Sequence, residues 1–311
     1  MKRYLLLLLA LIIACIPLGC GQSPTQSKTA ADGLKIVTTL FPQYDFARQL
    51  TDDTAQITLL LPPGTESHSF EPKPMDISNI YEADLFIYTG EYMEPWAAKI
   101  IAGAPDTLTV VDASTGITLA GDEHDDDHAH DPSHNHAYDP HIWLDPTMAM
   151  QMVENISAAL IQADPDKAER YRQNTEQYLA DLQQLDEDIM QMVQQAERKV
   201  LVFGGHFAYR YFLERYGISW ESAYGSGSSH DEPSMKRMDE IIKFIRQNNI
   251  PVIFHEEMVD PKIARTISQE TGTQMLVFHT IHNLSKDEMQ QGLTYIDIMR
   301  QNAENVRIGL N

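Results

Sequence analysis

Histidines and carboxylates gather between residues 122 and 146, and their side chains are well suited to metal chemistry. Five of the twelve histidines fall within thirteen residues of this stretch: His124, His128, His130, His134 and His136. Imidazole nitrogens suit zinc, copper and nickel. The tract lacks apolar periodicity, and its like charges would repel one another in a helix. We therefore expect a loop over residues 122–138, called here the collecting loop, with weak and multiple metal sites.

A sixth histidine, His141, has a different setting. It lies in Asp139-Pro-His-Ile-Trp-Leu-Asp-Pro146, between two Asp-Pro pairs and directly before three apolar residues. An apolar environment can hold one imidazole in one orientation. The sequence therefore predicts a fixed site that begins at His141 and is separate from the collecting loop.

Other histidines follow apolar runs that have the composition of strands. His68 follows the run at residues 57–61, His206 follows the run at 200–203, and His279 and His282 follow the run at 275–278. In an open parallel sheet, ligands bind beyond the carboxyl ends of the strands. We expect several of these histidines to converge with His141, although no short-range motif decides which of them do.

The elements that must position these residues alternate between strand and helix. Strand-like runs at 35–40, 57–61, 85–88 and 108–111 alternate with helical patterns, and so do runs at 199–203, 218–220, 252–255 and 275–278, before a final helix over 286–305. Such alternation predicts βαβ units and mainly parallel sheets. The predicted class is α/β, with two lobes that each contain such a sheet flanked by helices, because the chain is long for one small core.

A long helix is predicted between the two halves. A helical pattern runs to about residue 163, and a second restarts at Asp164-Pro165 and continues to about residue 193. About 30 residues of helix would span about 45 Å, enough to link two lobes. A coiled-coil arm is the alternative, but the apolar heptad is neither strict nor sustained.

The first residues have the pattern of an export signal over residues 1–19. A short basic start precedes an apolar core of about ten residues, too short to span a bilayer. Leu18-Gly19-Cys20 looks like a lipoprotein processing site, so we expect a lipid on Cys20, a polar tether over residues 20–33, and attachment to the outer face of the cell membrane. Cys15 is a competing site.

Both cysteines lie in this leader, so the folded body has no disulfide and no thiolate metal ligand. Any metal must then be held by nitrogen and oxygen. The formal net charge of −22 disfavours nucleic acid as a partner and favours cations.

Taken together, these motifs resemble the metal-binding lipoproteins that deliver zinc or manganese to ATP-driven importers, in the group whose lobes are joined by a rigid long helix. The resemblance covers roughly residues 34–311. It implies an N-terminal lobe over 34–145, helices including the long linking helix over 146–198, and a C-terminal lobe over 199–311. It also implies one metal between the lobes, a monomer, and an ABC importer permease as partner. The motifs that carry it are Gly64 to Pro72 with His68, the Asp-Pro-His segment above, Gly204-Gly-His-Phe-Ala-Tyr209, and Val252-Ile-Phe-His-Glu-Glu257.

The resemblance carries three ligands over to His68, His141 and His206. Manganese members tend to hold a carboxylate where His206 stands, so the sequence points to Zn(II) rather than Mn(II). The family usually places Asp or Glu after the last strand, whereas this chain reads Phe278-His-Thr-Ile-His282. Aligning the turn that follows selects His282 as the fourth ligand, with His279 and Glu256 as substitutes.

The ligand chemistry agrees with zinc, which accepts four imidazoles in a tetrahedron, whereas manganese prefers oxygen. Nearby carboxylates could accept hydrogen bonds from the imidazoles and fix their tautomers. The sequence suggests four of these: Glu66, Asp145, Glu256 and Glu257.

We therefore expect an extracytoplasmic zinc-binding lipoprotein that passes Zn(II) to an ABC importer, and not an enzyme. A manganese-binding homologue is one alternative. A zinc hydrolase with Glu256 or Glu257 as general base is another, but the chain has no His-Glu-x-x-His or Gly-x-Ser-x-Gly motif. A surface adhesin or metal buffer that uses only the collecting loop is the third.

Overall fold

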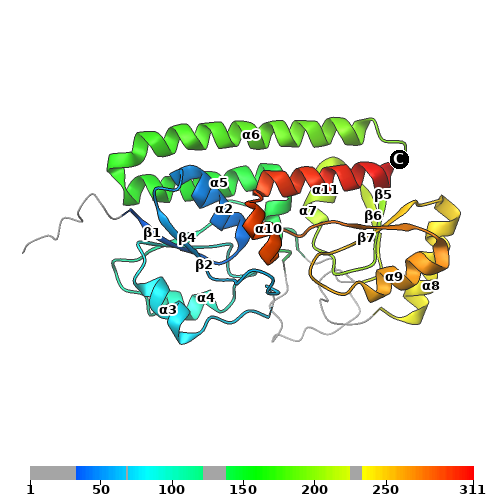
Figure 1. Ribbon diagram of the computed structural model, residues 1–311, viewed down its shortest axis with the longest axis horizontal. Coiled ribbons are helices and arrows are strands. Elements are labelled where there is room, and N and C mark those ends of the chain that lie inside the picture. Colours follow the sequence, from blue (N-terminus) through cyan, green and yellow to red (C-terminus); the bar gives the residue numbers. More distant parts are fainter. Residues whose placement is uncertain (1–32, 68, 122–137, 225–232) are drawn as a thin grey trace, which may run out of the picture. The chain divides into compact units, whose positions relative to one another are not determined.

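Two parallel sheets, each with helices packed around it, carry several of the predicted site residues near the ends of their strands (Figure 1). The computed structural model describes residues 33–67, 69–121, 138–224 and 233–311. Within these ranges the first sheet has four strands in the order β2-β1-β3-β4, and the second has four in the order β6-β5-β7-β8. All pairings within both sheets are parallel. The predicted α/β class with two mainly parallel sheets is confirmed.

The strands are short apolar runs, as their composition predicts. Those of the first sheet are β1 (Lys35–Thr38), β2 (Gln56–Leu59), β3 (Leu85–Tyr88) and β4 (Thr109–Asp112). Those of the second sheet are β5 (Val200–Phe203), β6 (Ser219–Ser222), β7 (Val252–His255) and β8 (Gln274–Val277). The two sheets have the same topology. In each, the second strand lies on one side of the first strand and the third strand lies on its other side, so the direction in which strands are added reverses between β1 and β3 and between β5 and β7. Ligands of open α/β sheets bind at such reversals.

Helices alternate with these strands. They are α2 (Phe41–Thr51), α3 (Pro74–Tyr81), α4 (Ala97–Ile101), α5 (Pro146–Ala163), α6 (Ala168–Gln194), α7 (Arg210–Tyr216), α8 (Met235–Asn248) and α9 (Lys262–Thr271). The chain ends with α10 (Lys286–Gln291) and α11 (Tyr295–Leu310). The prediction of one final helix is wrong, because Gly292 adopts a left-handed conformation that ends α10. Among the described helices, none is long and apolar enough to cross a membrane.

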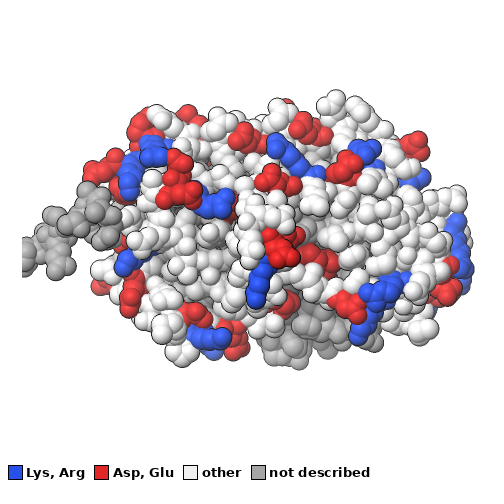
Figure 2. All heavy atoms as spheres, viewed as in Figure 1, with Lys and Arg blue, Asp and Glu red and all other residues white. Residues whose placement is uncertain are grey.

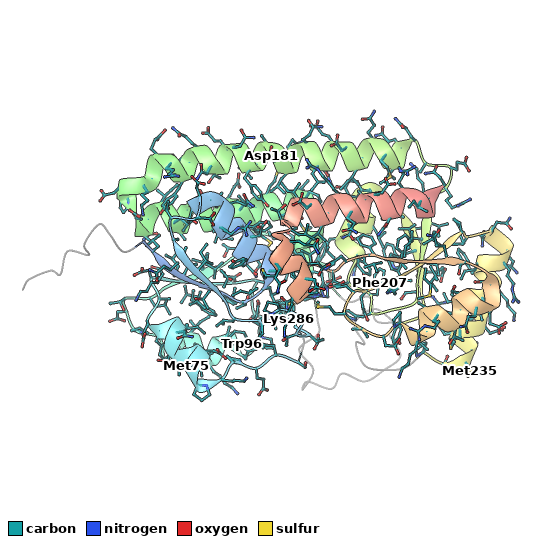
Figure 3. The ribbon with its side chains drawn as sticks, in the orientation of Figure 1. Met75, Trp96, Asp181, Phe207, Met235 and Lys286 are labelled. Atoms are coloured by element: carbon teal, nitrogen blue, oxygen red, sulfur yellow. The ribbon has the colours of Figure 1, made fainter. Side chains whose placement is uncertain are left out.

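The long helix α6 packs against both halves of the chain, beside α5 and α11 (Figure 1). One face of the helix is buried through Tyr171, Leu182 and Ile189, while Asp181, labelled in Figure 3, is only half-buried. Asn174 donates a hydrogen bond to the carbonyl of Leu50, at the end of α2. The carboxylate of Asp186 accepts two hydrogen bonds from Arg215, in α7. The long helix therefore contacts α2, which follows a strand of the first sheet, and α7, which follows a strand of the second, as a linking helix must.

Charged side chains form a mixed surface. On the face shown in Figure 2, acidic and basic residues lie among one another over the helices. Ion pairs within helices contribute to this pattern, such as Lys243 with Asp239 and Arg307 with Glu304. Interspersed charge of this kind is typical of a solvated helix surface.

The reversal point of the first sheet holds a buried carboxylate, Glu94. Its oxygens accept hydrogen bonds from the Thr39 hydroxyl and from the backbone N–H groups of Thr89 and Gly90. Burial outweighs these donors and raises the pKa of Glu94 to about 7. The folded state therefore binds this proton more tightly than the unfolded state does.

Stability should fall as pH rises from about 4.5 to about 7, because the unfolded chain ionises this carboxyl first. We expect Glu94→Gln to match the parent at pH 4 and to exceed its free energy of unfolding at pH 7.5 by up to about 3 kcal/mol. Urea unfolding of both proteins without zinc, at the two pH values, measures the difference. An equal pH dependence in parent and variant would contradict the assignment.

Candidate metal centre

Three of the predicted ligands lie together in the structure. The ring centroids of His141 and His282 are 4.9 Å apart, and those of His141 and His206 are 5.8 Å apart. Four imidazoles arranged as a tetrahedron at the usual zinc–nitrogen distance would have ring centroids about 5 Å apart. The spacing of these rings therefore fits one shared zinc ion. His68 lies outside the described residues.

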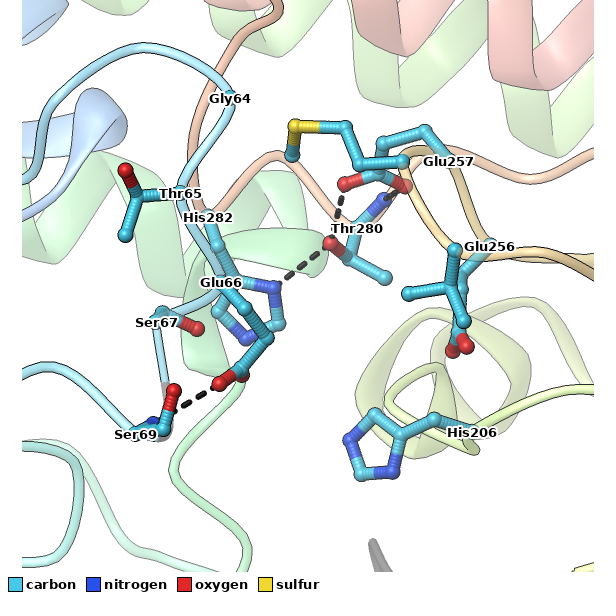
Figure 4. A pocket seen from close by; sticks show the side chains of 12 residues that line it. Gly64, Thr65, Glu66, Ser67, Ser69, His206, Glu256, Glu257, Thr280 and His282 are labelled. Carbon is cyan, nitrogen blue, oxygen red and sulfur yellow. Dashed lines mark hydrogen bonds between the residues drawn. The ribbon is translucent and has the colours of Figure 1, made fainter.

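A cavity of about 370 Å³ opens beside these rings and is lined from both halves of the chain (Figure 4). The first half contributes Gly64, Thr65, Glu66, Ser67 and Ser69, and the second contributes His206, Glu256, Glu257, Met258, Val259, Thr280 and His282. Ser67 and Ser69 flank the predicted ligand His68 in the sequence. The cavity thus brings together the segments that follow β2, β5, β7 and β8, each of which the sequence analysis selected.

His141 is fixed by Asp139. The Asp139 carboxylate lies 2.7 Å from Nδ1 of His141 and also accepts a hydrogen bond from its backbone N–H, at 3.0 Å. A carboxylate can only accept, so Nδ1 carries the proton and Nε2 is the nitrogen that can bind a metal. The fully buried turn Ile142–Leu144 follows directly. Sequence reasoning missed Asp139, although its place two residues before a predicted ligand was a usable signal.

Asp145, suggested as a partner of a ligand imidazole, has another role. Its carboxylate accepts hydrogen bonds from the backbone N–H and the hydroxyl of Thr147, both at 2.7 Å. These contacts cap the N-terminus of α5, which begins at Pro146. The contacts that the structure shows for Asp145 are those of a helix cap and use only Oδ1, so its suggested role beside an imidazole stays a prediction.

His206 follows the end of β5 across two glycines. A side chain at Gly204 would place its Cβ 2.7 Å from the Cα of Ala264, so glycine allows α9 to pack closely against the strand end. The imidazole of His206 lies in the cavity close to Glu256 (Figure 4). Burial, and then the charge of Glu257, raise the pKa of Glu256 to about 7. Glu256 lines the cavity, so it stays a candidate substitute ligand.

His279 and His282 differ in what their rings contact. Nδ1 of His279 accepts a hydrogen bond from the Ile281 N–H at 2.9 Å, and its Nε2 lies 3.6 Å from the carboxylate of Glu288. His282 instead lines the cavity and packs against the His141 ring. These contacts favour His282 over His279 as a ligand.

Comparison with known proteins identifies a matching family and similar relatives. A family model described as "Zinc-uptake complex component A periplasmic" matches residues 36–308. The chain is 37% identical over 310 residues to the high-affinity zinc uptake system protein ZnuA of Bacillus subtilis, covering 97% of each. It is 34% identical over 306 residues to the zinc-binding lipoprotein AdcA of Streptococcus pneumoniae, where it spans 60% of that longer protein.

Solved structures of metal-binding proteins also resemble this chain in fold. The metal-dependent lipoprotein YcdH of Bacillus subtilis is 36% identical, with a TM-score of 0.77 over 89% of this chain and 99% of that one. The Zn(II)-bound ZnuA-like domain of Streptococcus pneumoniae AdcA is 31% identical, with a TM-score of 0.75 and the same coverage. The laminin-binding protein of Streptococcus agalactiae, described as an adhesin with metal transporting activity, is 28% identical, with a TM-score of 0.78 over 90% of this chain and all of that one.

Proposed function

The chain belongs to the family of periplasmic zinc-uptake component A proteins, and from this we propose that it binds Zn(II) and delivers it to an ABC-type importer. The proposed ligands are His68, His141, His206 and His282. The convergence of three imidazoles, with ring centroids 4.9 and 5.8 Å apart, is the observation that carries the proposal. Zinc is the ion that a site of this composition suits best.

The protein is a binding component of a transport system and not an enzyme, as the family indicates. The contacts of Glu257, one of the two candidate general bases of a hydrolase, agree with the absence of an enzymatic role. Glu257 accepts two hydrogen bonds from Thr280, at 2.6 and 2.8 Å, which engage both of its carboxylate oxygens. A residue held in this way is suited to support its neighbours rather than to take a proton from water.

Function outside the cytoplasmic membrane follows from the family. We propose, more specifically, a monomer attached to the outer face of the cell membrane through a lipid on Cys20, with the importer's permease as partner. Residues 1–19 as signal and the tether over 20–33 belong to this proposal, and residues 1–32 lie outside the described part of the chain. The lobe boundaries at 34–145, 146–198 and 199–311 also remain predictions.

The collecting loop is proposed to hold zinc weakly and apart from the main site. Its histidines, His124, His128, His130, His134 and His136, lie outside the described residues. Its two ends lie side by side, because Gly121 and Tyr138 form an antiparallel β-bridge and the Asp139 N–H bonds to the Ala120 carbonyl at 3.0 Å. A two-residue turn such as Asn-Gly can close ends of this kind.

Replacing residues 122–137 with Asn-Gly should therefore leave one tight zinc per chain and remove the weak zinc. Metal analysis and calorimetric titration of parent and variant, each with manganese as competitor, measure both classes of site and the zinc preference. Loss of the tight site together with the loop would support the adhesin or buffer alternative instead. Stronger binding of manganese than of zinc in the parent would contradict the proposed cargo.

A further inference from the structure

A chain of two short contacts leads from a carboxylate to the imidazole of His282 (Figure 4). Nδ1 of His282 lies 2.6 Å from the hydroxyl oxygen of Thr280, and this hydroxyl lies 2.6 Å from Oε1 of Glu257. The backbone N–H of Thr280 also donates to Oε2 of Glu257, at 2.8 Å. Both oxygens of one carboxylate therefore hold one residue, and that residue contacts a proposed ligand.

The direction of these hydrogen bonds follows from the number of protons available. A carboxylate accepts, and a threonine hydroxyl has one proton to give. If that proton goes to Glu257, the hydroxyl can only accept from the ring. Nδ1 of His282 must then carry the proton, and Nε2 becomes the nitrogen that can coordinate zinc.

We propose that Thr280 and Glu257 are positioning residues that set the tautomer of His282 for zinc binding. This inference rests on the proposed function and deepens it. It assigns to His282 the kind of support that Asp139 gives His141 directly, but with a hydroxyl between carboxylate and ring. Carboxylate partners of ligating imidazoles raise metal affinity because they orient the ring and increase its basicity.

The other contact of Glu257 does not compete with this role. Its Oε1 lies 3.5 Å from Nδ1 of His279. That nitrogen already accepts a hydrogen bond from the Ile281 N–H at 2.9 Å, so it has no proton to donate to the carboxylate. Thr280 is therefore the residue that Glu257 holds.

The backbone of the turn fixes the Thr280 hydroxyl in place. Ile281 is buried and has a φ of +62°, which is uncommon for a β-branched residue and persists only where surrounding contacts enforce it. Such contacts are present on both sides. The indole N–H of Trp143 donates to the Thr280 carbonyl at 2.8 Å, and the Phe41 N–H donates to the His282 carbonyl at 3.0 Å.

The test measures the tautomer of His282 in zinc-free protein by nitrogen-15 NMR, with the signal assigned by its absence in His282→Ala. We expect the Nδ1–H form in the parent. Thr280→Val keeps the size of the side chain but removes the hydroxyl, so it should shift His282 toward the Nε2–H form. Its affinity for Zn(II) should fall by about 10- to 100-fold, the range found when partners of metal ligands are lost.

Two matched variants separate this effect from general damage. Thr280→Ser keeps the hydroxyl and should restore both the tautomer and the zinc affinity. Thr266→Val removes a hydroxyl of the same lobe that bonds to the Lys262 carbonyl in α9, and it should change neither. If Thr280→Val does not fold, Glu257→Gln supplies the second test, with the same shift of tautomer expected.

The proposal is overturned if His282 keeps the Nδ1–H form in Thr280→Val, or if that variant binds Zn(II) within threefold of the parent. It is also overturned if Thr280→Ser loses affinity as fully as Thr280→Val, because packing of the methyl group would then explain the loss. A parent that binds no zinc would refute the proposed function instead. The tautomer, measured without metal, would still decide the role of Thr280.

Discussion

His282→Ala should weaken zinc binding by at least 10- to 100-fold, about 1.4 to 2.8 kcal/mol, because a lost ligand costs at least as much as a lost partner of a ligand. The His282 ring lies 4.9 Å from that of His141 and lines the cavity, so its removal opens one coordination position to water. His279→Ala should weaken zinc binding by less than tenfold. Its ring supports the turn at Ile281 and contacts Glu288 instead of the cavity.

Competition titrations with a zinc chelator measure these affinities, and urea unfolding of the zinc-free proteins shows whether each variant is folded. His282→Asp should bind zinc better than His282→Ala, because an oxygen ligand fits zinc and its charge offsets part of that of the ion. It should also narrow the preference for zinc over manganese, since the harder ligand favours the harder ion. Parent-like zinc binding by His282→Ala, with a large loss in His279→Ala or Glu256→Ala, would require a different ligand set.

Trp143→Ala should lower the free energy of unfolding by about 3–5 kcal/mol, the usual cost of removing a large buried aromatic side chain. Trp143 is fully buried, and its indole packs edge-on against the rings of His282 and His141, at centroid distances of 5.1 and 5.5 Å. Its N–H bonds to the Thr280 carbonyl, and its own carbonyl accepts from the Tyr295 hydroxyl. The variant should therefore also bind zinc more weakly, because two of the proposed ligands lose a common support.

Trp143→Phe is the matched control, since it keeps an aromatic ring and removes only the N–H and part of the volume. It leaves the buried Thr280 carbonyl without this donor, which costs about 1–3 kcal/mol. Urea unfolding of zinc-free parent and variants, followed by zinc titration, should place Trp143→Phe between the other two in both measurements. An unfolding midpoint of Trp143→Ala close to that of the parent would contradict the assigned role.

Local patterns in the sequence were sufficient to predict the layout of the fold. Apolar runs at 35–40, 200–203 and 252–255 predicted strands, and the strands β1, β5 and β7 lie there. The restart at Asp164-Pro165 predicted the beginning of the long helix, which the structure places at Ala168–Gln194. These features depend on side-chain periodicity and turn residues within one segment, so neighbouring residues encode them.

The same local reasoning placed His206 a few residues after an apolar strand, and the structure puts it three residues past the end of β5, where the strand order reverses. His141 was predicted from its apolar neighbours, and Ile142–Leu144 are indeed fully buried. The residue types and their positions relative to strand ends therefore indicated a metal site of nitrogen ligands before any distance was known.

Only the tertiary structure decided how the rings at residues 279 and 282 are oriented. The two histidines are three residues apart, and the positive φ of Ile281 between them turns one ring to the cavity and the other to Glu288. Contacts from Trp143 and Phe41, far away in the sequence, hold that turn. The partners of the imidazoles were hidden for the same reason. Which side chain supports a given imidazole depends on the residues that tertiary packing brings within hydrogen-bonding distance of the ring. Periodicity along the chain carries no information about these distances.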